Sequence, residues 1–180
     1  EIGAVGARLL FPDGVVQHAG VVLGQHGIAG HVFMGLPRGG VGYFGWDRLV
    51  RPYSAVTGAC MMTRRSVFEE LGGFDEQLEV AFNDIDFCLR LGDRGYGVLY
   101  TPHAELVHHE SVSRGISGFF HDYRYFLRKW PRARLHDDPF YNPNLGLFAQ
   151  WCPLREPDED AQWEQLMDRL EGVDPFGALA

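Results

Sequence analysis

Short apolar segments separated by glycine and proline divide this chain, and they decide which elements it can form. Residues 2–10 are largely apolar and end at Pro12-Asp13-Gly14, a turn tripeptide. We therefore expect one strand over residues 2–10 and a second over residues 15–23. Residues 24–45 sustain neither a strand period nor a helix period, so we expect a long loop there.

The middle of the chain predicts a mixture of strands and helices. Residues 53–62 indicate a buried strand, and Thr63 is suited to cap a short helix that Gly72 and Gly73 end. Asn83 is suited to cap the next helix, which ends at Gly92 or Gly95. The buried stripe of that helix is Ile85, Cys88 and Leu89. Two short strands are expected over residues 97–100 and 104–107.

Helical spacing dominates the last third of the chain. Residues 117–130 follow it until Pro131 interrupts the pattern. Residues 158–171 predict an acidic helix with Trp163, Leu166 and Leu170 on one face, packed on this domain or on a neighbouring one. Strands mixed with helices in this way indicate an α/β fold.

Composition excludes several classes of protein. A chain of 180 residues with 46% hydrophobic and 22% charged residues is a globular protein, and its apolar runs are too short to span a membrane. A net charge of -8 argues against nucleic acid as a partner. Three cysteines, an odd number without a CxxC pair, favour a reducing, cytoplasmic location. The first residue is Glu1, so the chain reads as the interior of a longer protein.

Two carboxylates open the helix predicted after Asn83. Asp84 and Asp86 lie two positions apart, which places them on opposite sides of a helix, so we expect different roles for them. Asp86 precedes Arg90 by four residues, the spacing of a helix-surface ion pair. Asp84 lies in the first turn, where either a charge that favours the helix dipole or a catalytic base would fit.

Two histidines follow the strand predicted over residues 104–107. Adjacent side chains of a strand point in opposite directions, so only one of His108 and His109 can face a site. That histidine could ligate a metal, and an ordinary polar strand end is the alternative.

A basic run lies around Trp130. For this run we favour a solvated helix face, with contact to an anionic lipid as the alternative. Its members are Arg124, Arg128, Lys129, Arg132 and Arg134.

The segment from residue 56 to residue 115 resembles the family 2 glycosyltransferases, which have the GT-A fold. The matching positions are Thr57-Gly58-Ala59, Arg64-Arg65, Phe68, Gly72-Gly73-Phe74-Asp75-Glu76, Asn83-Asp84-Ile85-Asp86, Leu89-Arg90, Gly95, Pro102, Ala104, His108 and Ser113. Upstream, Asp13 to Gly20 resembles the segment that follows the nucleotide-binding half of these enzymes. Downstream, Asp138 to Leu145 resembles members that build O-antigen and rhamnose-containing polysaccharides.

This resemblance implies a role for several residues. Asp84 matches the base that deprotonates the acceptor hydroxyl, and His108 matches a histidine that can complete a divalent metal site for Mn²⁺ or Mg²⁺. Gly58 and Ala59 match small residues of the acceptor pocket. Asn83, next to the base, stands where the family usually has Glu, and we place it among the acceptor-binding residues.

The resemblance also implies a fold and an activity. Residues 1–150 are expected to form the acceptor-side half of a GT-A domain, a Rossmann-like mixed sheet flanked by helices. Residues 151–180 are expected to form a linker and an amphipathic helix. The chain is expected to lack the N-terminal half of the same domain, which carries a D-x-D metal motif in this family. No D-x-D sequence precedes residue 84 here.

We therefore expect part of an inverting glycosyltransferase that is inactive in isolation. Its partners would be a nucleotide-sugar donor and a polysaccharide or lipid-linked acceptor of bacterial surface-glycan assembly, at the inner face of the membrane. The alternative is a noncatalytic glycan-binding or assembly module that keeps the same frame.

Overall fold

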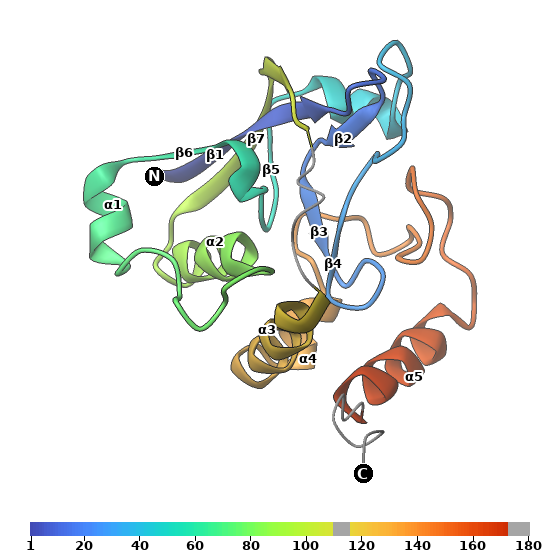
Figure 1. The fold of residues 1–180 in the computed structure, drawn as a ribbon. Coiled ribbons are helices and arrows are strands. Elements are labelled where there is room, and N and C mark those ends of the chain that lie inside the picture. Colours follow the sequence, from blue (N-terminus) through green and yellow to red (C-terminus); the bar gives the residue numbers. More distant parts are fainter. Residues whose placement is uncertain (110–115, 173–180) are drawn as a thin grey trace.

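A five-stranded mixed sheet forms the centre of the computed structural model, which describes residues 1–109 and 116–172 (Figure 1). Four strands follow the order β2-β1-β7-β5, and β6 also pairs with β1. The strands are β1 (Ile2–Leu10), β2 (Val16–His18), β5 (Arg51–Pro52), β6 (Met61–Thr63) and β7 (Gly97–Val107). The chain is therefore of mixed α/β type, as expected.

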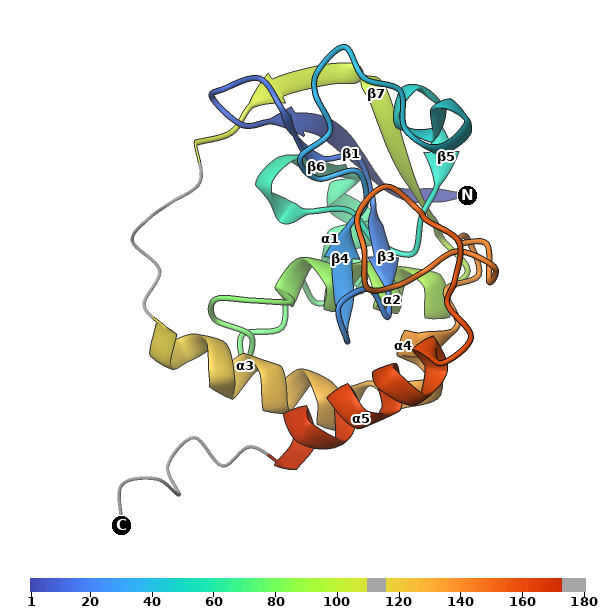
Figure 2. The same cartoon turned by 90° about the vertical axis from the view of Figure 1, so that its right-hand side faces the viewer.

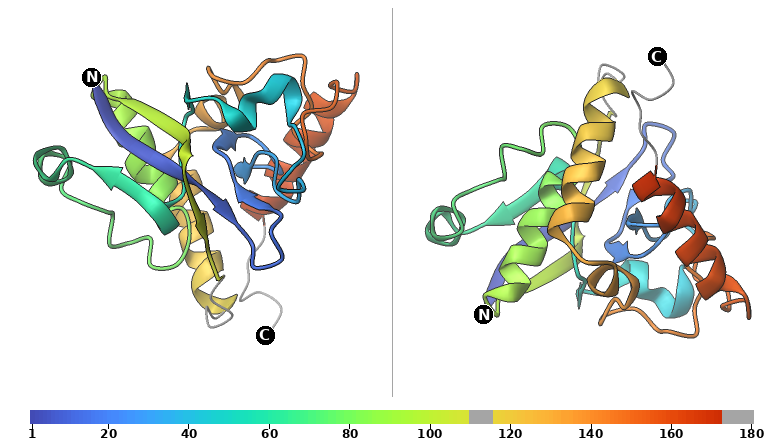
Figure 3. Two further views of the ribbon diagram at one scale, coloured as in Figure 1. Left: turned by 90° about the horizontal axis from the view of Figure 1, so that it is seen from above. Right: turned by 90° about the horizontal axis from the view of Figure 1, so that it is seen from below.

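The two long strands, β1 and β7, run parallel and lie side by side when the molecule is seen from above (Figure 3). Their register shifts where Ala7 faces Thr101 and Arg8 faces Glu105. Residues 102–104 therefore bulge out of the pairing. The prediction of two separate strands around Pro102 was wrong, because the bulge absorbs the proline without ending the strand.

The strand predicted over residues 15–23 is two strands in two sheets. β2 pairs with β1, whereas β3 (Val21–Leu23) forms a hairpin with β4 (Ala29–His31) inside the predicted loop. Between them Gly20 has φ +115°, and any side chain there would collide with the ring of Tyr53. The chain can turn out of the first sheet at this point because residue 20 has no Cβ.

Residues 53–62 are buried at first but do not form the predicted strand. The N–H of Tyr53 donates to Val98 O of β7, and Ala55 O accepts from Val21 N of β3. The backbone hydrogen bonds of this segment are thus made first with β7 and then with β3. Its first apolar side chains, Tyr53, Ala55 and Val56, are buried, which explains why it resembles a core strand in sequence.

Five helices cover the sheet and the hairpin in the described ranges. They are α1 (Arg65–Glu70), α2 (Asn83–Asp93), α3 (Ile116–Lys129), α4 (Arg132–His136) and α5 (Glu159–Gly172). A short 3-10 helix, η1 (Tyr43–Arg48), lies in the long loop, and a second, η2 (Gly58–Cys60), precedes β6. None of the helices in these ranges is long and apolar enough to cross a membrane.

Both predicted N-caps were wrong. The hydroxyl of Thr63 donates to Gly3 O of β1 at 2.7 Å instead of capping α1. Helix α2 begins at Asn83 itself, and its N-cap is Phe82 in the left-handed region with φ +61°. The ring of Phe82 packs on Tyr123 and Phe126 of α3, and this packing fixes the unusual backbone conformation.

A buried carboxylate joins α2 to α3. Asp86 accepts hydrogen bonds from Arg90 Nε at 2.7 Å and from Trp130 Nε1 at 3.0 Å, and Lys129 Nζ lies 2.7 Å from it. The expected pair of Asp86 with Arg90 is therefore confirmed, but it is buried rather than on the helix surface, because Asp86 has no exposed area.

The acidic C-terminal helix, α5, packs on this domain beside α4 and the β3–β4 hairpin (Figure 2). Trp163 is fully buried, and its indole N–H lies 3.0 Å from Gly24 O and 2.9 Å from Gly27 O. Arg132 of α4 forms ion pairs with Glu164, Asp168 and Glu171. Residues 173–180, the end of the predicted tail, lie outside the described residues.

Replacing Asp86 by alanine should lower the free energy of unfolding by about 3 kcal/mol, because it removes the anion that two cations and an indole N–H share. Urea unfolding of the two proteins measures this difference. Arg65→Ala is a matched control that breaks an exposed ion pair with Glu69, and it should cost about 0.5 kcal/mol or less. Equal losses in the two variants would contradict a central role for Asp86.

Candidate functional site

Asp84 lies in the first turn of α2 with a half-buried side chain. Its Oδ2 accepts a hydrogen bond from Gly58 N at 2.7 Å, and its Oδ1 accepts one from Ile85 N at 2.8 Å. These contacts fix the orientation of the carboxylate while leaving part of it accessible. A group reaching this carboxylate would approach it beside the exposed turn at Gly58 and Ala59.

The turn that faces Asp84 is formed by Thr57, Gly58 and Ala59. Thr57 caps η2 by accepting a hydrogen bond from Ala59 N, and the N–H of Gly58 is left to point at the carboxylate. A Cβ on residue 58 would lie 3.3 Å from Asp84 Cβ, closer than most such contacts. Gly58 therefore allows a close approach of backbone to carboxylate.

Asn83 is the first residue of α2 and is half-buried, next to Asp84. The described residues give its side chain no hydrogen-bond partner. The structure thus brings together four of the residues singled out in the sequence, namely Gly58, Ala59, Asn83 and Asp84.

Several other residues of the recognised string support this helix. Arg90 donates to Leu71 O and Gly73 O at 2.8 Å each, and Asp75 accepts from Lys129 at 2.6 Å and from Tyr125 at 2.9 Å. The rings of Phe68, Phe74 and Phe87 pack on one another. These contacts hold α1, the following loop and α3 against α2, and so they position Asp84.

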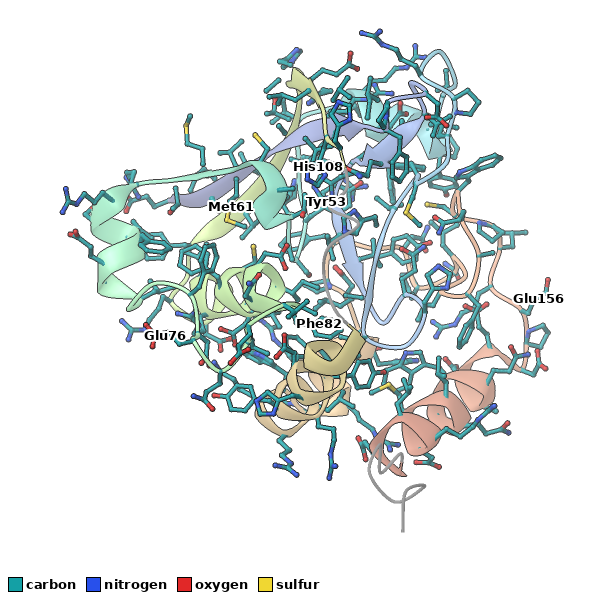
Figure 4. The ribbon with its side chains drawn as sticks, in the orientation of Figure 1. Tyr53, Met61, Glu76, Phe82, His108 and Glu156 are labelled. Atoms are coloured by element: carbon teal, nitrogen blue, oxygen red, sulfur yellow. The ribbon has the colours of Figure 1, made fainter. Side chains whose placement is uncertain are left out.

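His108 follows β7 directly and is half-buried, whereas His109 is exposed. The backbone N–H of His108 donates to Leu10 O of β1 at 2.9 Å. Its Nδ1 lies 2.8 Å from Oε1 of Gln17, a buried residue of β2 (Figure 4 labels His108). Ser113, the last position of the recognised string, lies outside the described residues.

Sequence reasoning missed Gln17. The signal was a pair of polar residues, Gln17 and His18, between the apolar residues Val16 and Ala19, in a segment already noted for its family resemblance. Buried polar side chains need a partner, and a search for one would have pointed to Gln17.

Two adjacent residues of β2 contact the two groups of predicted site residues, one group each. Next to Gln17, His18 is fully buried, and its Nε2 lies 3.5 Å from Thr57 N. Its Nδ1 lies 3.3 Å from Nδ1 of His31. Gln17 thus contacts His108, while His18 contacts the turn that binds Asp84.

Burial lowers the pKa of His18 well below its ordinary value, and the neighbouring His31 lowers it further. His18 is therefore neutral near pH 7. A neutral imidazole can accept the Thr57 N–H through Nε2, and its own proton is then on Nδ1.

The described residues do not form a metal site by themselves. No three side chains among His, Cys, Asp and Glu gather in the described ranges closely enough to hold an ion. His108 fits the role of a single ligand, because its Nδ1 is engaged by Gln17 and no partner of its Nε2 is found in the same ranges. Additional ligands would have to come from elsewhere.

The basic run does not form one continuous cationic surface. Lys129 pairs with Asp75 and Asp86, Arg132 with three acidic residues of α5, and Arg134 lies 3.5 Å from Asp93. These three members of the run are thus paired with carboxylates.

A cavity of about 330 Å³ lies elsewhere, between α4 and the loop that follows it. It is lined by His136, Asp137, Asp138, Pro139, Tyr141, Pro143, Leu145, Leu147 and Arg155. None of the residues predicted as site residues lines it.

Comparison with known proteins gives consistent matches. The family model described as glycosyl transferase family group 2 matches residues 14–133. The O-antigen biosynthesis protein RfbC of Myxococcus xanthus is 46% identical over 180 residues, which cover 97% of this chain and 14% of that protein. Protein y4gI of Sinorhizobium fredii is 47% identical over 166 residues, or 87% of this chain and 18% of that protein.

A third relative matches a shorter stretch. The N-acetylglucosaminyl-diphospho-decaprenol L-rhamnosyltransferase of Mycobacterium tuberculosis is 42% identical over 65 residues, or 36% of this chain and 21% of that enzyme. The chain thus spans less than a quarter of the length of each of these three relatives.

The neutral state of His18 predicts a stability that depends on pH. Above the unfolded-state pKa of about 6.5, neither state binds the proton; below it, the unfolded chain binds the proton while the native chain does not. The free energy of unfolding should therefore fall as the pH drops below about 6.5, with this group contributing about 1.4 kcal/mol per pH unit until the lowered native pKa is reached.

Urea unfolding at pH 7.5, 6.5 and 5.5 measures this slope. His18→Gln should make the slope shallower, whereas His109→Gln, at an exposed position, should leave it unchanged. An unchanged slope in the His18 variant would show that another group is responsible.

Proposed function

Because this chain belongs to the family 2 glycosyltransferases, we propose that its parent protein transfers a sugar from a nucleotide-sugar to a polysaccharide or lipid-linked acceptor, with inversion at the anomeric carbon. The reaction would serve bacterial surface-glycan assembly on the cytoplasmic side of the membrane. The names of the relatives support this proposal, since one concerns O-antigen and another a decaprenol-linked sugar.

The observation that carries the proposal is the placement of Asp84. An inverting transfer needs a base that removes the proton of the acceptor hydroxyl as this oxygen attacks the anomeric carbon. The carboxylate of Asp84 is half-buried, oriented by Gly58 N, and set on a helix that Asp86 and Arg90 fix. We assign it the role of general base.

The acceptor would be bound next to this base. Gly58 and Ala59 form an exposed turn without bulky side chains, and Asn83 offers an amide that is able both to donate and to accept hydrogen bonds. A sugar hydroxyl held by these groups would lie beside Asp84.

His108 would be one ligand of Mn²⁺ or Mg²⁺, through Nε2. When bound, the ion would supply positive charge to the diphosphate leaving group. The remaining ligands would come from the nucleotide-binding half of the domain and from the donor. This proposal is supported by the small share of its relatives that the chain spans, because most of the length of those relatives lies outside the matched region.

A noncatalytic glycan-binding or assembly module is the second candidate. Asn83 favours it, because the family usually has a carboxylate at this position. Such a module would bind a glycan through the same turn but would not need the charge of Asp84.

In the full-length protein, Asp84→Asn should preserve the KM for the donor and reduce turnover by about 10² to 10⁴, because an amide cannot accept the proton. Transfer of a radiolabelled sugar from the nucleotide donor measures both quantities. Asp93→Asn is the matched control, an exposed aspartate on the same helix that should keep normal turnover. Normal turnover in a folded Asp84→Asn protein would favour the noncatalytic module.

Substitutions of the two histidines should have different effects on the Mn²⁺ dependence of activity. His108→Ala should raise the Mn²⁺ concentration for half-maximal activity more than tenfold, or about 1.4 kcal/mol, since one ligand is lost. His109→Ala should change this concentration little, because the side chain is exposed. A larger shift in the His109 variant would reverse the assignment.

A further inference from the structure

Gln17 is the one neighbour of the His108 ring that hydrogen-bonds to it within the described residues. It lies on β2, is 5% exposed, and places Oε1 at 2.8 Å from Nδ1 of His108. The two residues are 91 positions apart in sequence, and the strands that carry them lie on either side of β1. The contact therefore depends on the assembled sheet.

We propose that Gln17 is a positioning residue that holds His108 in the Nδ1–H tautomer and so presents the Nε2 lone pair outward. A carbonyl oxygen only accepts hydrogen bonds, so the proton of the neutral imidazole must be on Nδ1. The second nitrogen then carries a lone pair, as a metal ligand requires. The assignment of the tautomer rests on the geometry of this contact alone, whereas its use in binding an ion rests on the proposed function.

The backbone on both sides makes this contact rigid. The N–H of His108 donates to Leu10 O, which extends the pairing of β7 with β1 by one residue. Next to Gln17, Val16 donates to Leu36 O and accepts from Gly35 N. Neither strand can shift without breaking these bonds, so the amide and the imidazole are held in register.

The amide of Gln17 suits this task, because its oxygen accepts the proton of Nδ1 while the side chain itself stays neutral. Gln17 fixes the tautomer without adding charge to a buried position. These contacts also give two residues of the Asp13 to Gly20 segment a role. Gln17 contacts His108, and His18 contacts the turn facing Asp84.

Nitrogen NMR of the ¹⁵N-histidine-labelled chain tests the tautomer at a pH where the imidazole is neutral. The signals of His108 are assigned among the eight histidines by their loss in His108→Asn. We expect the Nδ1–H pattern in the wild type, its loss in Gln17→Met, and its retention in Gln17→Glu, which keeps an acceptor oxygen.

The matched control is Gln150→Met, which removes the exposed contact of Gln150 with His26 and should leave the His108 signals unchanged. An Nε2–H pattern in the wild type, or the same pattern in wild type and Gln17→Met, would overturn the proposal.

Mn²⁺ affinity of the full-length protein, measured by EPR of the free ion, tests the consequence. Gln17→Met should weaken binding about 10-fold to 100-fold, and Gln17→Glu should weaken it less. Weakened binding in His108→Ala with unchanged binding in Gln17→Met would overturn the positioning role. Normal binding in His108→Ala would instead overturn the proposed metal role of His108, and the NMR result would then decide the tautomer alone.

Discussion

The carboxylate of Asp86 is completely shielded from solvent, and three donors from two helices converge on it. Arg90 lies on the same helix, whereas Lys129 and Trp130 come from the end of α3 and the residue after it. A buried charge is costly unless it is fully paired, so this carboxylate permits only one arrangement of α2 against α3. Arg90 also binds the carbonyls of Leu71 and Gly73, and the same arrangement thereby fixes the loop between α1 and α2.

Two carboxylates of one short sequence motif therefore have opposite surroundings. Asp86 is enclosed by cations and is part of the scaffold. Among the described residues, Asp84 binds backbone N–H groups alone and remains partly open. The helix turns by about 200° between them, which is enough to place one in the core and the other at the surface. The motif combines a structural anchor with an accessible carboxylate at the shortest spacing that separates them in this way.

Local patterns predicted the elements that a regular apolar spacing marks in the sequence. β1, α3 and α5 were recognised because their apolar spacing and their turn residues agree, and the pair of Asp86 with Arg90 follows from helix geometry. The split at Gly20, the bulge after Thr101 and the cap at Phe82 were missed, because contacts with distant residues decide each of them. For the same reason, sequence spacing could not predict the contact of Gln17 with His108. Asp84 was singled out as a candidate base through the family resemblance.

The parallel pair at the centre of the sheet also bears on how this domain folds. Each residue of β1 meets a partner about 95 positions later in the chain, so closing this pair carries the loop entropy of half the polypeptide. During synthesis β1 leaves the ribosome long before β7 exists, and until then only the short strands β2 and β6 can occupy one of its edges. The other edge stays open until β7 arrives, and an unpaired strand edge is a template for pairing with other chains.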